Sequence, residues 1–406
     1  MAPVGSFESL QAAIQGGADA VYFGVEKLNM RSRSSKNFAT ADLKKIVDIA
    51  ANREIKTYLT LNTVMYDSDM DMMRKIVDEA KVSGVDAIIA SDPAVFDYVQ
   101  QQGLPVHLST QANVSNIESV RYYSRIADVI VLARELTLGQ VKEISEAIQK
   151  EHITGHSGEL VRIEMFVHGA LCMAISGKCY LSLHQTNYSA NRGACLQICR
   201  RSYTVRDTDT GDEIEIENEH IMSPKDLLTI HFLDKILGAG VTVLKIEGRA
   251  RSPEYVYTVS QCYSDAIDSI LTGTYSKEKI ESWIERLKAV FNRGFWDGYY
   301  LGQRLGEWSD RYGSRATRRK IYIGKGVNYF RKAKVAEFII ETKTLKKGDR
   351  ILITGPTTGM IESVVDEIRV DDNPVLETKK GARITISLPT VIRASDKLYK
   401  LIDVTV

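Results

Sequence analysis

Thiols are scarce in this chain, and so is any excess of charge. Five of the 406 residues are cysteine, and the formal net charge is +1. A disulfide-stapled extracellular domain would be shorter and richer in cysteine. A net charge near zero provides no global field that draws a protein to nucleic acid, so any polyanion binding must depend on local basic patches.

Long apolar runs and familiar peptidase motifs are also missing. No run approaches the roughly 20 apolar residues of a membrane helix. The start, MAPVGSFESL, has neither a basic nor an apolar leader segment, so we expect no signal peptide, no membrane partner and a cytoplasmic location. Neither HExxH nor GxSxG occurs. A Cys–His protease stays open, because such partners can meet only in the folded chain.

A repeated pattern predicts the fold of the first three quarters of the chain. An amphipathic helical stretch, a glycine turn and a short apolar strand recur around residues 10–25, 73–92 and 227–248. Strands that are apolar on both faces are typical of covered parallel sheets, so the pattern predicts a TIM-like (β/α)8 barrel. The eight candidate strands are AVYFGV, KTYLTLN, DAIIAS, PVHLST, DVIVLAR, IEMFVHG, HIMSP and VLKIEG. Alternatively, MAPVG forms the first strand and HIMSP is a loop.

The chain divides into three parts by its pattern. We expect residues 1–307 to form the barrel domain, with a cysteine loop at 172–199. Alternating strands with Gly, Pro and Asp turns predict a small antiparallel β-barrel over 321–406. The segment 308–320, WSDRYGSRATRRK, is polar and basic and is expected to be a linker.

Polar residues follow the candidate strands, where (β/α)8 barrels carry their active sites. The candidate catalytic residues are His168, Lys245, Glu247 and Arg249. Lys245 and Glu247 alternate with apolar neighbours, so both should point to one face, and there they must pair or bind a ligand. The candidate substrate-binding residues are Asn29, Arg31, Arg33, Asn62, Gln111, Arg134, Glu135 and Lys225. The alternative is that these are ordinary caps and turn formers, and that His168 is a structural histidine.

Four of the five cysteines are concentrated in one segment, at Cys172, Cys179, Cys195 and Cys199. Gaps of six, fifteen and three residues separate them, so only the last pair has the close spacing of zinc fingers. A longer gap fits a loop around a larger object, such as a 4Fe–4S cluster held by four thiolates. A zinc site and free thiols remain alternatives.

The cysteine segment also carries a family resemblance. EMFVHGALCMAISGKCYLS followed by NRGACLQICR resembles the signature region of the collagenase-like peptidase family of unassigned catalytic type, peptidase family U32. LNMRSRSSKNF, HLSTQANVSN and LKIEGRARSPEYV are similar to the same family, so the resemblance covers residues 1 to about 302. The C-terminal part resembles the accessory β domain of that family.

The resemblance implies an activity, a cofactor and partners. The better-understood branches are prephenate-dependent hydroxylases of tRNA and rRNA, and the tRNA branch implies 5-hydroxyuridine at the wobble position. It also implies an iron–sulfur cluster (4Fe–4S), prephenate as co-substrate and tRNA as partner; any electron donor is unidentified. The implied cluster ligands are Cys172, Cys179, Cys195 and Cys199. The alternatives are an rRNA cytidine hydroxylase, a collagenase-like peptidase and a non-catalytic assembly partner.

Arginine and lysine residues are the candidates for binding these anions. Guanidinium groups bind carboxylates as a bidentate fork, so Arg31, Arg33, Arg134 and Arg249 are candidate clamps for prephenate. The linker supplies a candidate RNA patch for phosphate contacts. Its members are Arg311, Arg315, Arg318, Arg319 and Lys320.

Overall fold

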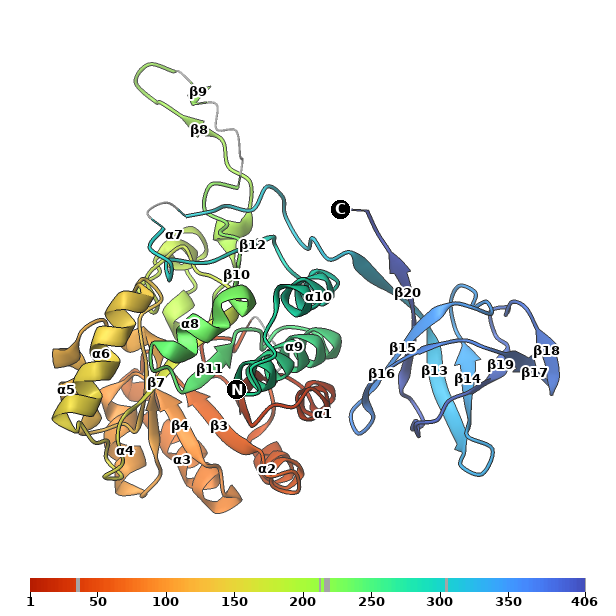
Figure 1. Ribbon diagram of the computed structural model, residues 1–406, viewed down its shortest axis with the longest axis horizontal. Coiled ribbons are helices and arrows are strands. Elements are labelled where there is room, and N and C mark those ends of the chain that lie inside the picture. The colour runs from red at the N-terminus through yellow and green to blue at the C-terminus, as the bar shows by residue number, and fades with distance from the viewer. Residues whose placement is uncertain (34–36, 212, 215–219, 304–305, 406) are drawn as a thin grey trace.

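The computed structural model describes residues 1–33, 37–211, 213–214, 220–303 and 306–405. Two sheets, each with its own hydrophobic core, form the bulk of the protein (Figure 1). The first is a mostly parallel sheet of ten strands, and the second is an antiparallel sheet of eight. Over the described residues, no helix combines the length and the apolar character needed to cross a membrane.

The parallel sheet follows the chain order from β1 to β7. Its strands are β1 (Ala2–Pro3), β2 (Ala20–Phe23), β3 (Lys56–Leu61), β4 (Ala87–Ala90), β5 (Val106–Leu108), β6 (Val129–Val131), β7 (Arg162–Ala170), β10 (Asp226–Leu228), β11 (Val243–Ile246) and β12 (Phe295–Trp296). Strand β7 pairs in parallel with β11 and antiparallel with β10, which in turn pairs with β12.

The two ends of this strand order lie close together. The amino group of Met1 donates to the carbonyl of Leu244 at 2.8 Å, and the amide of Ile246 donates to the carbonyl of Met1 at 3.2 Å. MAPVG therefore contains the first strand, and HIMSP lies before β10 as a loop, as in the alternative interpretation. The parallel α/β architecture is confirmed, although the described ladders do not close β1 onto β11.

Helices pack around the parallel strands (Figure 1). They are α1 (Phe7–Gln15), α2 (Leu43–Ala51), α3 (Met70–Ser83), α4 (Pro93–Gln101), α5 (Ile117–Ser124), α6 (Leu138–Glu151), α7 (Leu181–Thr186), α8 (Leu233–Gly238), α9 (Pro253–Leu271) and α10 (Lys277–Lys288). Local signals set their ends. Helix α4 begins with Asp92 as a side-chain cap and Pro93 in its first turn, and α3 ends at Gly84 with φ 83°.

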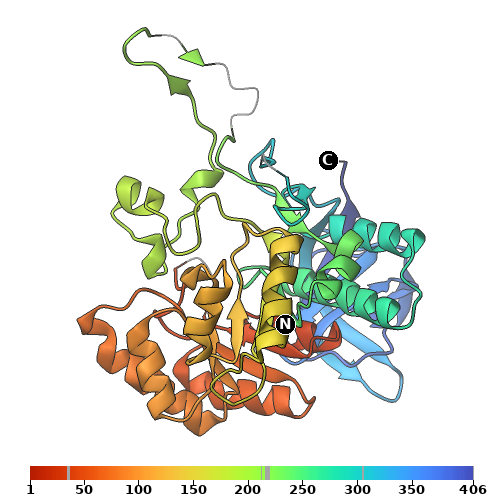
Figure 2. The same ribbon diagram turned by 60° about the vertical axis from the view of Figure 1, so that its left-hand side comes forward.

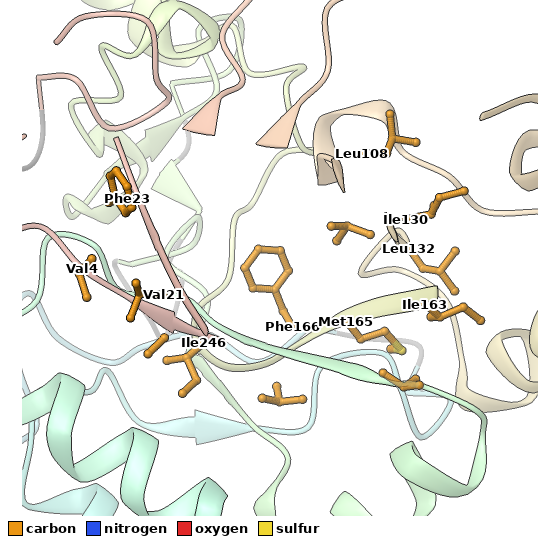
Figure 3. Packing of buried hydrophobic residues seen from close by; sticks show 14 of the residues in the cluster. Val4, Val21, Phe23, Leu108, Ile130, Leu132, Ile163, Met165, Phe166 and Ile246 are labelled. Atoms are coloured by element: carbon orange, nitrogen blue, oxygen red, sulfur yellow. The ribbon is translucent and has the colours of Figure 1, made fainter. Parts of the chain in front are cut away.

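Apolar side chains of the strands form the core of the first sheet. Figure 3 shows the packing of ten labelled members of this cluster, which come from the β1 end of the sheet, from β5 to β7 and from β11. Val21, Phe23, Ile130 and Val167 are fully buried. Strands this short and this apolar are stable only when helices cover their outer face.

The second sheet has the order β16–β15–β20–β13–β14–β19–β17–β18. Its strands are β13 (Arg318–Phe330), β14 (Val335–Ile340), β15 (Arg350–Gly355), β16 (Gly359–Val364), β17 (Ile368–Val370), β18 (Asn373–Val375), β19 (Arg383–Ser387) and β20 (Lys397–Asp403). The antiparallel character is as predicted, and β13 begins inside the expected linker. Gln15 of α1 joins the two parts, since its amide accepts from Met360 at 2.9 Å and donates to Thr358 at 3.0 Å.

A narrow two-stranded arm projects from the body on the same side as α7 (Figures 1 and 2). It contains β8 (Val205–Arg206) and β9 (Glu213–Ile214). The cysteine segment lies between β7 and this arm.

Candidate functional site

The cysteine segment is anchored across the carboxyl ends of the parallel strands. It contains α7 and the short turns η4 (Ala190–Arg192) and η5 (Ile198–Arg200). The amide of Val64 donates to Asn191, and the amide of Arg33 donates to Gly193, both at 3.1 Å. Gly193 has φ 84°, and a Cβ there would lie 2.1 Å from the hydroxyl of Ser32, so glycine is required at this contact. The β2 and β3 loops thus hold the segment in place.

A cavity of about 180 Å³ lies between the strand ends and the cysteine segment. All four clustered cysteines line it. The other candidate residues that line it are Arg31, Asn62, Gln111, Arg134, Lys245, Glu247 and Arg249. Side chains that are far apart in the sequence therefore share one site at the edge where parallel α/β proteins bind ligands.

Glu247 is the one carboxylate among the described residues that line this cavity. Its Oε1 lies 2.7 Å from Nη2 of Arg31, and its Oε2 accepts from the hydroxyl of Tyr22 at 3.3 Å. Burial alone would raise the pKa of Glu247, but the charges of Arg31 and Arg249 outweigh it and leave the pKa below its usual value. Glu247 is therefore ionised at neutral pH and can accept a proton or a hydrogen bond.

Arg249 lines the cavity and is held in place by neutral groups. Its Nη1 donates to Oδ1 of Asn29 at 3.1 Å and to the hydroxyl of Thr60 at 2.8 Å. Burial lowers the pKa of Arg249 to about 10, and the guanidinium remains charged at neutral pH. Asn29 does not line the cavity, so its contribution is to orient Arg249.

Lys245 lines the cavity and forms a buried ion pair behind it. Its Nζ lies 2.6 Å from Oε1 of Glu164, and the two side chains are 6% and 0% exposed. Nζ also lies 4.8 Å from the ring centroid of Tyr22 and 5.5 Å from that of Phe166. The ammonium group is thus fixed below the cavity by one carboxylate and two ring faces.

The cavity carries an excess of positive charge. Counted over the residues that the structure describes, its lining includes six cationic side chains and one carboxylate. Three of the six, namely Arg134, Arg200 and Arg249, form no salt bridge within the described part of the chain. Arg134 donates to the hydroxyl of Ser176 at 2.9 Å, and Arg200 donates to Ser223 and to backbone carbonyls. Unmatched cations in a partly enclosed site favour an anionic ligand.

The four cavity cysteines are free thiols. The pKa of Cys199 is raised to about 11, chiefly by burial; the neighbouring Cys172, Cys195 and Cys179 also raise it, and the charge of Arg200 opposes them. Among the described residues, no three Cys, His, Asp or Glu side chains are close enough to hold a single metal ion. The four thiols share the lining of one cavity.

The structure places His168 away from the cavity. Its ring packs among Tyr255, Tyr263 and Phe295, and burial lowers its pKa to about 3. The cause is a bulge in β7: Lys245 lies opposite Phe166, and the next residue of β11 lies opposite His168. The extra residue reverses which face the following side chain occupies.

Three more candidates lie outside the cavity lining. Lys225 pairs with Glu307 at 2.7 Å, and Glu135 is exposed. The guanidinium of Arg33 lies 4.4 Å from the ring centroid of Tyr188, on the cysteine segment.

The sequence analysis did not identify Arg293 as a site residue. It also did not predict that Arg200 lines the cavity and donates hydrogen bonds to Ser223 and to backbone carbonyls. Arg293 lines the cavity, where it pairs with Asp226 at 3.3 Å and donates to Gln197 at 3.2 Å. The motif FNRGFWDGYYLG contains this arginine, but no strand ends there in the sequence pattern. Its place depends on β12, a two-residue strand that no periodicity could identify.

A protein-family model and several known proteins match this chain over most of its length. The family model described as Peptidase family U32 matches residues 5–310. A protein from Porphyromonas gingivalis (strain ATCC BAA-308 / W83) named "Collagenase" is 61% identical over 400 residues, covering 98% of this chain and 97% of that protein. "tRNA hydroxylation protein P1" of Bacillus subtilis is 32% identical over 382 residues, covering 90% and 86%. "23S rRNA 5-hydroxycytidine C2501 synthase" of Escherichia coli is 33% identical over 302 residues, covering 73% and 44%.

Proposed function

Because the chain belongs to peptidase family U32, we propose that it is an RNA base hydroxylase that uses prephenate and forms 5-hydroxyuridine in tRNA. One observation carries the proposal: four thiols and six cations line the same cavity. The thiols suit a redox-active cluster and the cations suit a small dicarboxylate. The proposal also takes the parallel strands as a closed (β/α)8 barrel, which the hydrogen bonds between Met1 and β11 support.

The cluster would be held by Cys172, Cys179, Cys195 and Cys199. The donor chemistry fits, since all four are thiols outside any disulfide and line one cavity. When bound there, the cluster would supply one-electron transfer or an iron site for an oxygen-bearing ligand. A cytoplasmic location belongs to the proposal, because a reducing compartment keeps these thiols available.

The chain's own residues would bind and orient prephenate. Arg134 and Arg249 present guanidinium groups without a carboxylate partner, so each can bind a carboxylate of the substrate. Lys245 adds a fixed positive charge below them. Glu247, kept ionised by Arg31, is the group that would accept a proton from the reacting base or from a bound water.

The test is nucleoside mass spectrometry of tRNA and rRNA from a deletion strain. We expect loss of 5-hydroxyuridine from tRNA, and its return with the wild-type gene but not with Cys199→Ser. Loss of 5-hydroxycytidine from rRNA instead would move the assignment to the rRNA branch. No lost hydroxylated nucleoside in either pool would refute RNA hydroxylation.

Collagen cleavage is the second candidate, favoured by the name of the Porphyromonas gingivalis relative. Cys199 offers little nucleophile for it, because a pKa of about 11 leaves this thiol protonated at neutral pH. Purified full-length protein should therefore leave denatured collagen intact. Cleavage that disappears in Cys199→Ser and persists in Cys262→Ser, a core cysteine, would favour the peptidase instead.

A further inference from the structure

Exposed apolar side chains occur on the cysteine segment and on the loop after β3, which is hydrogen-bonded to that segment. We call this group the mouth rim: Val64, Tyr66, Met173, Ile175, Tyr180, Tyr188 and Leu196. Five of them belong to the cysteine segment, and Ile175 also lines the cavity. Tyr180 is 74% exposed. Large apolar groups gathered at one place on a surface indicate an interaction site.

Two tyrosines of the mouth rim form cation–π contacts with arginine side chains. The guanidinium carbon of Arg192 lies 3.8 Å from the ring centroid of Tyr66, and that of Arg33 lies 4.4 Å from that of Tyr188. Both pairs flank η4, because Val64 and Arg33 donate backbone hydrogen bonds to the residues on either side of Arg192. Each pair combines a flat stacking surface with a positive charge.

The charge of the cysteine segment has one sign. No acidic residue occurs between Glu164 and Asp207, while the same stretch contains Lys178, Arg192 and Arg201. Lys178 and Arg201 are exposed. Asp69 of η2 (Asp67–Asp69) pairs with Arg192 and offsets only that one charge. On the cysteine segment the mouth rim is thus suited to an anionic partner with flat rings, whereas exposed Asp67 and Asp71 follow Tyr66 on the other side.

The linker offers less free charge than its sequence suggests. Four of its five cations are in ion pairs within the protein: Arg311 and Arg315 with Asp310, Arg318 with Glu362, and Lys320 with Glu254. The last pair joins β13 to α9, so it holds the two parts of the chain together. An RNA backbone would have to displace these carboxylates before it could bind there.

We infer that the mouth rim binds single-stranded RNA, with bases stacked on Tyr66 and Tyr188 on either side of the base that enters the cavity. The choice of RNA rests on the proposed function; the choice of a single strand rests on the surface. Aromatic side chains can stack only on bases that are already splayed from a helix, and such stacking tolerates any sequence. The excess cations in the cavity below extend the same attraction inward.

The test measures RNA binding alone, by fluorescence anisotropy with full-length protein and no prephenate. The probe is a labelled single-stranded RNA of about ten nucleotides, and a duplex of equal length is the comparison. We expect Tyr66→Ala and Tyr188→Ala each to weaken single-strand binding about tenfold. The matched control is Tyr122→Ala, which removes a 59% exposed tyrosine on α5. Circular dichroism and thermal melting check that each variant is folded.

Three results would overturn the inference. The first is unchanged single-strand affinity in both rim variants. The second is weaker binding in Arg319→Ala, at the exposed linker cation, but not in the rim variants. The third is that denatured collagen binds and RNA does not, and that the rim variants lose this collagen binding. The rim would then be a surface for polypeptide. RNA binding without any hydroxylated nucleoside lost in the deletion strain would support the rim and refute the proposed function.

Discussion

The buried pair of Lys245 and Glu164 provides the sharpest quantitative prediction. Oε1 of Glu164 accepts from Lys245 at 2.6 Å, and Oε2 has no hydrogen-bond partner in the described structure. Lys245→Met keeps the side-chain volume but leaves a carboxylate that is 0% exposed without its one strong partner. Removing one member of such a pair costs about 3–5 kcal/mol of unfolding free energy.

The reverse change should cost less. In Glu164→Gln the ammonium group keeps the ring faces of Tyr22 and Phe166 and can be hydrated from the cavity that it lines. The double variant should recover most of the loss, because neither charge is then buried alone.

Urea unfolding of the four proteins measures the cycle, with Lys142→Met as control because its pair with Glu146 is exposed and 3.7 Å long. The reasoning fails if Lys245→Met is as stable as the control, or if Glu164→Gln is the more damaging change.

Three further predictions concern the cavity and the displaced histidine. Anaerobic reconstitution should load iron and sulfide fully into Cys262→Ser and poorly into Cys199→Ser, as measured by metal analysis; equal loading would remove Cys199 from the ligand set. Arg134→Lys keeps the positive charge but loses the two parallel N–H donors of the guanidinium group, so we expect about a tenfold higher KM for prephenate at similar kcat. An unchanged KM would mean that the carboxylates of prephenate bind elsewhere. Burial lowers the pKa of His168 to about 3 from its usual 6.5, so between these two pH values the unfolded chain binds a proton that the folded chain does not, and stability rises with pH, most steeply between about pH 4 and 5.5. His168→Phe should flatten that slope by roughly 1.4 kcal/mol per pH unit and leave activity intact; loss of activity with normal folding would restore a catalytic role.

The sequence pattern predicted the repeating units of helix, glycine turn and strand, because these elements are determined by residues that are close together in the chain. The apolar strands and the glycine turns before them are where they were expected, and Gly84 closes α3 with a positive φ. The alternation of Lys245 and Glu247 with Leu244 and Ile246 predicted that both charges point to one face of the strand, and in the structure both line the cavity. HIMSP and MAPVG were ambiguous, since strands this short carry too little periodicity to distinguish them from loops.

The side-chain direction of His168 could not be predicted from the alternation along β7. Alternation along β7 from Glu164 through Phe166 would place the histidine on the cavity side as well. A single extra residue at the bulge opposite β11 turned it toward Tyr255 and Tyr263. A bulge depends on the partner strand, which the sequence of β7 alone does not contain.

The sequence by itself determined which side chains are available: four clustered thiols, a stretch without acids around them, and arginines after the strands. Only the tertiary structure decided which charges remain unmatched. Arg31 meets Glu247 across 216 positions of the sequence, and Lys245 meets Glu164 across 81. Within the described part of the chain, Arg134 and Arg249 form hydrogen bonds only with neutral groups. Pairing depends on distances of a few ångströms between residues far apart in the chain, and those distances are fixed only when the sheet and the cysteine segment pack together.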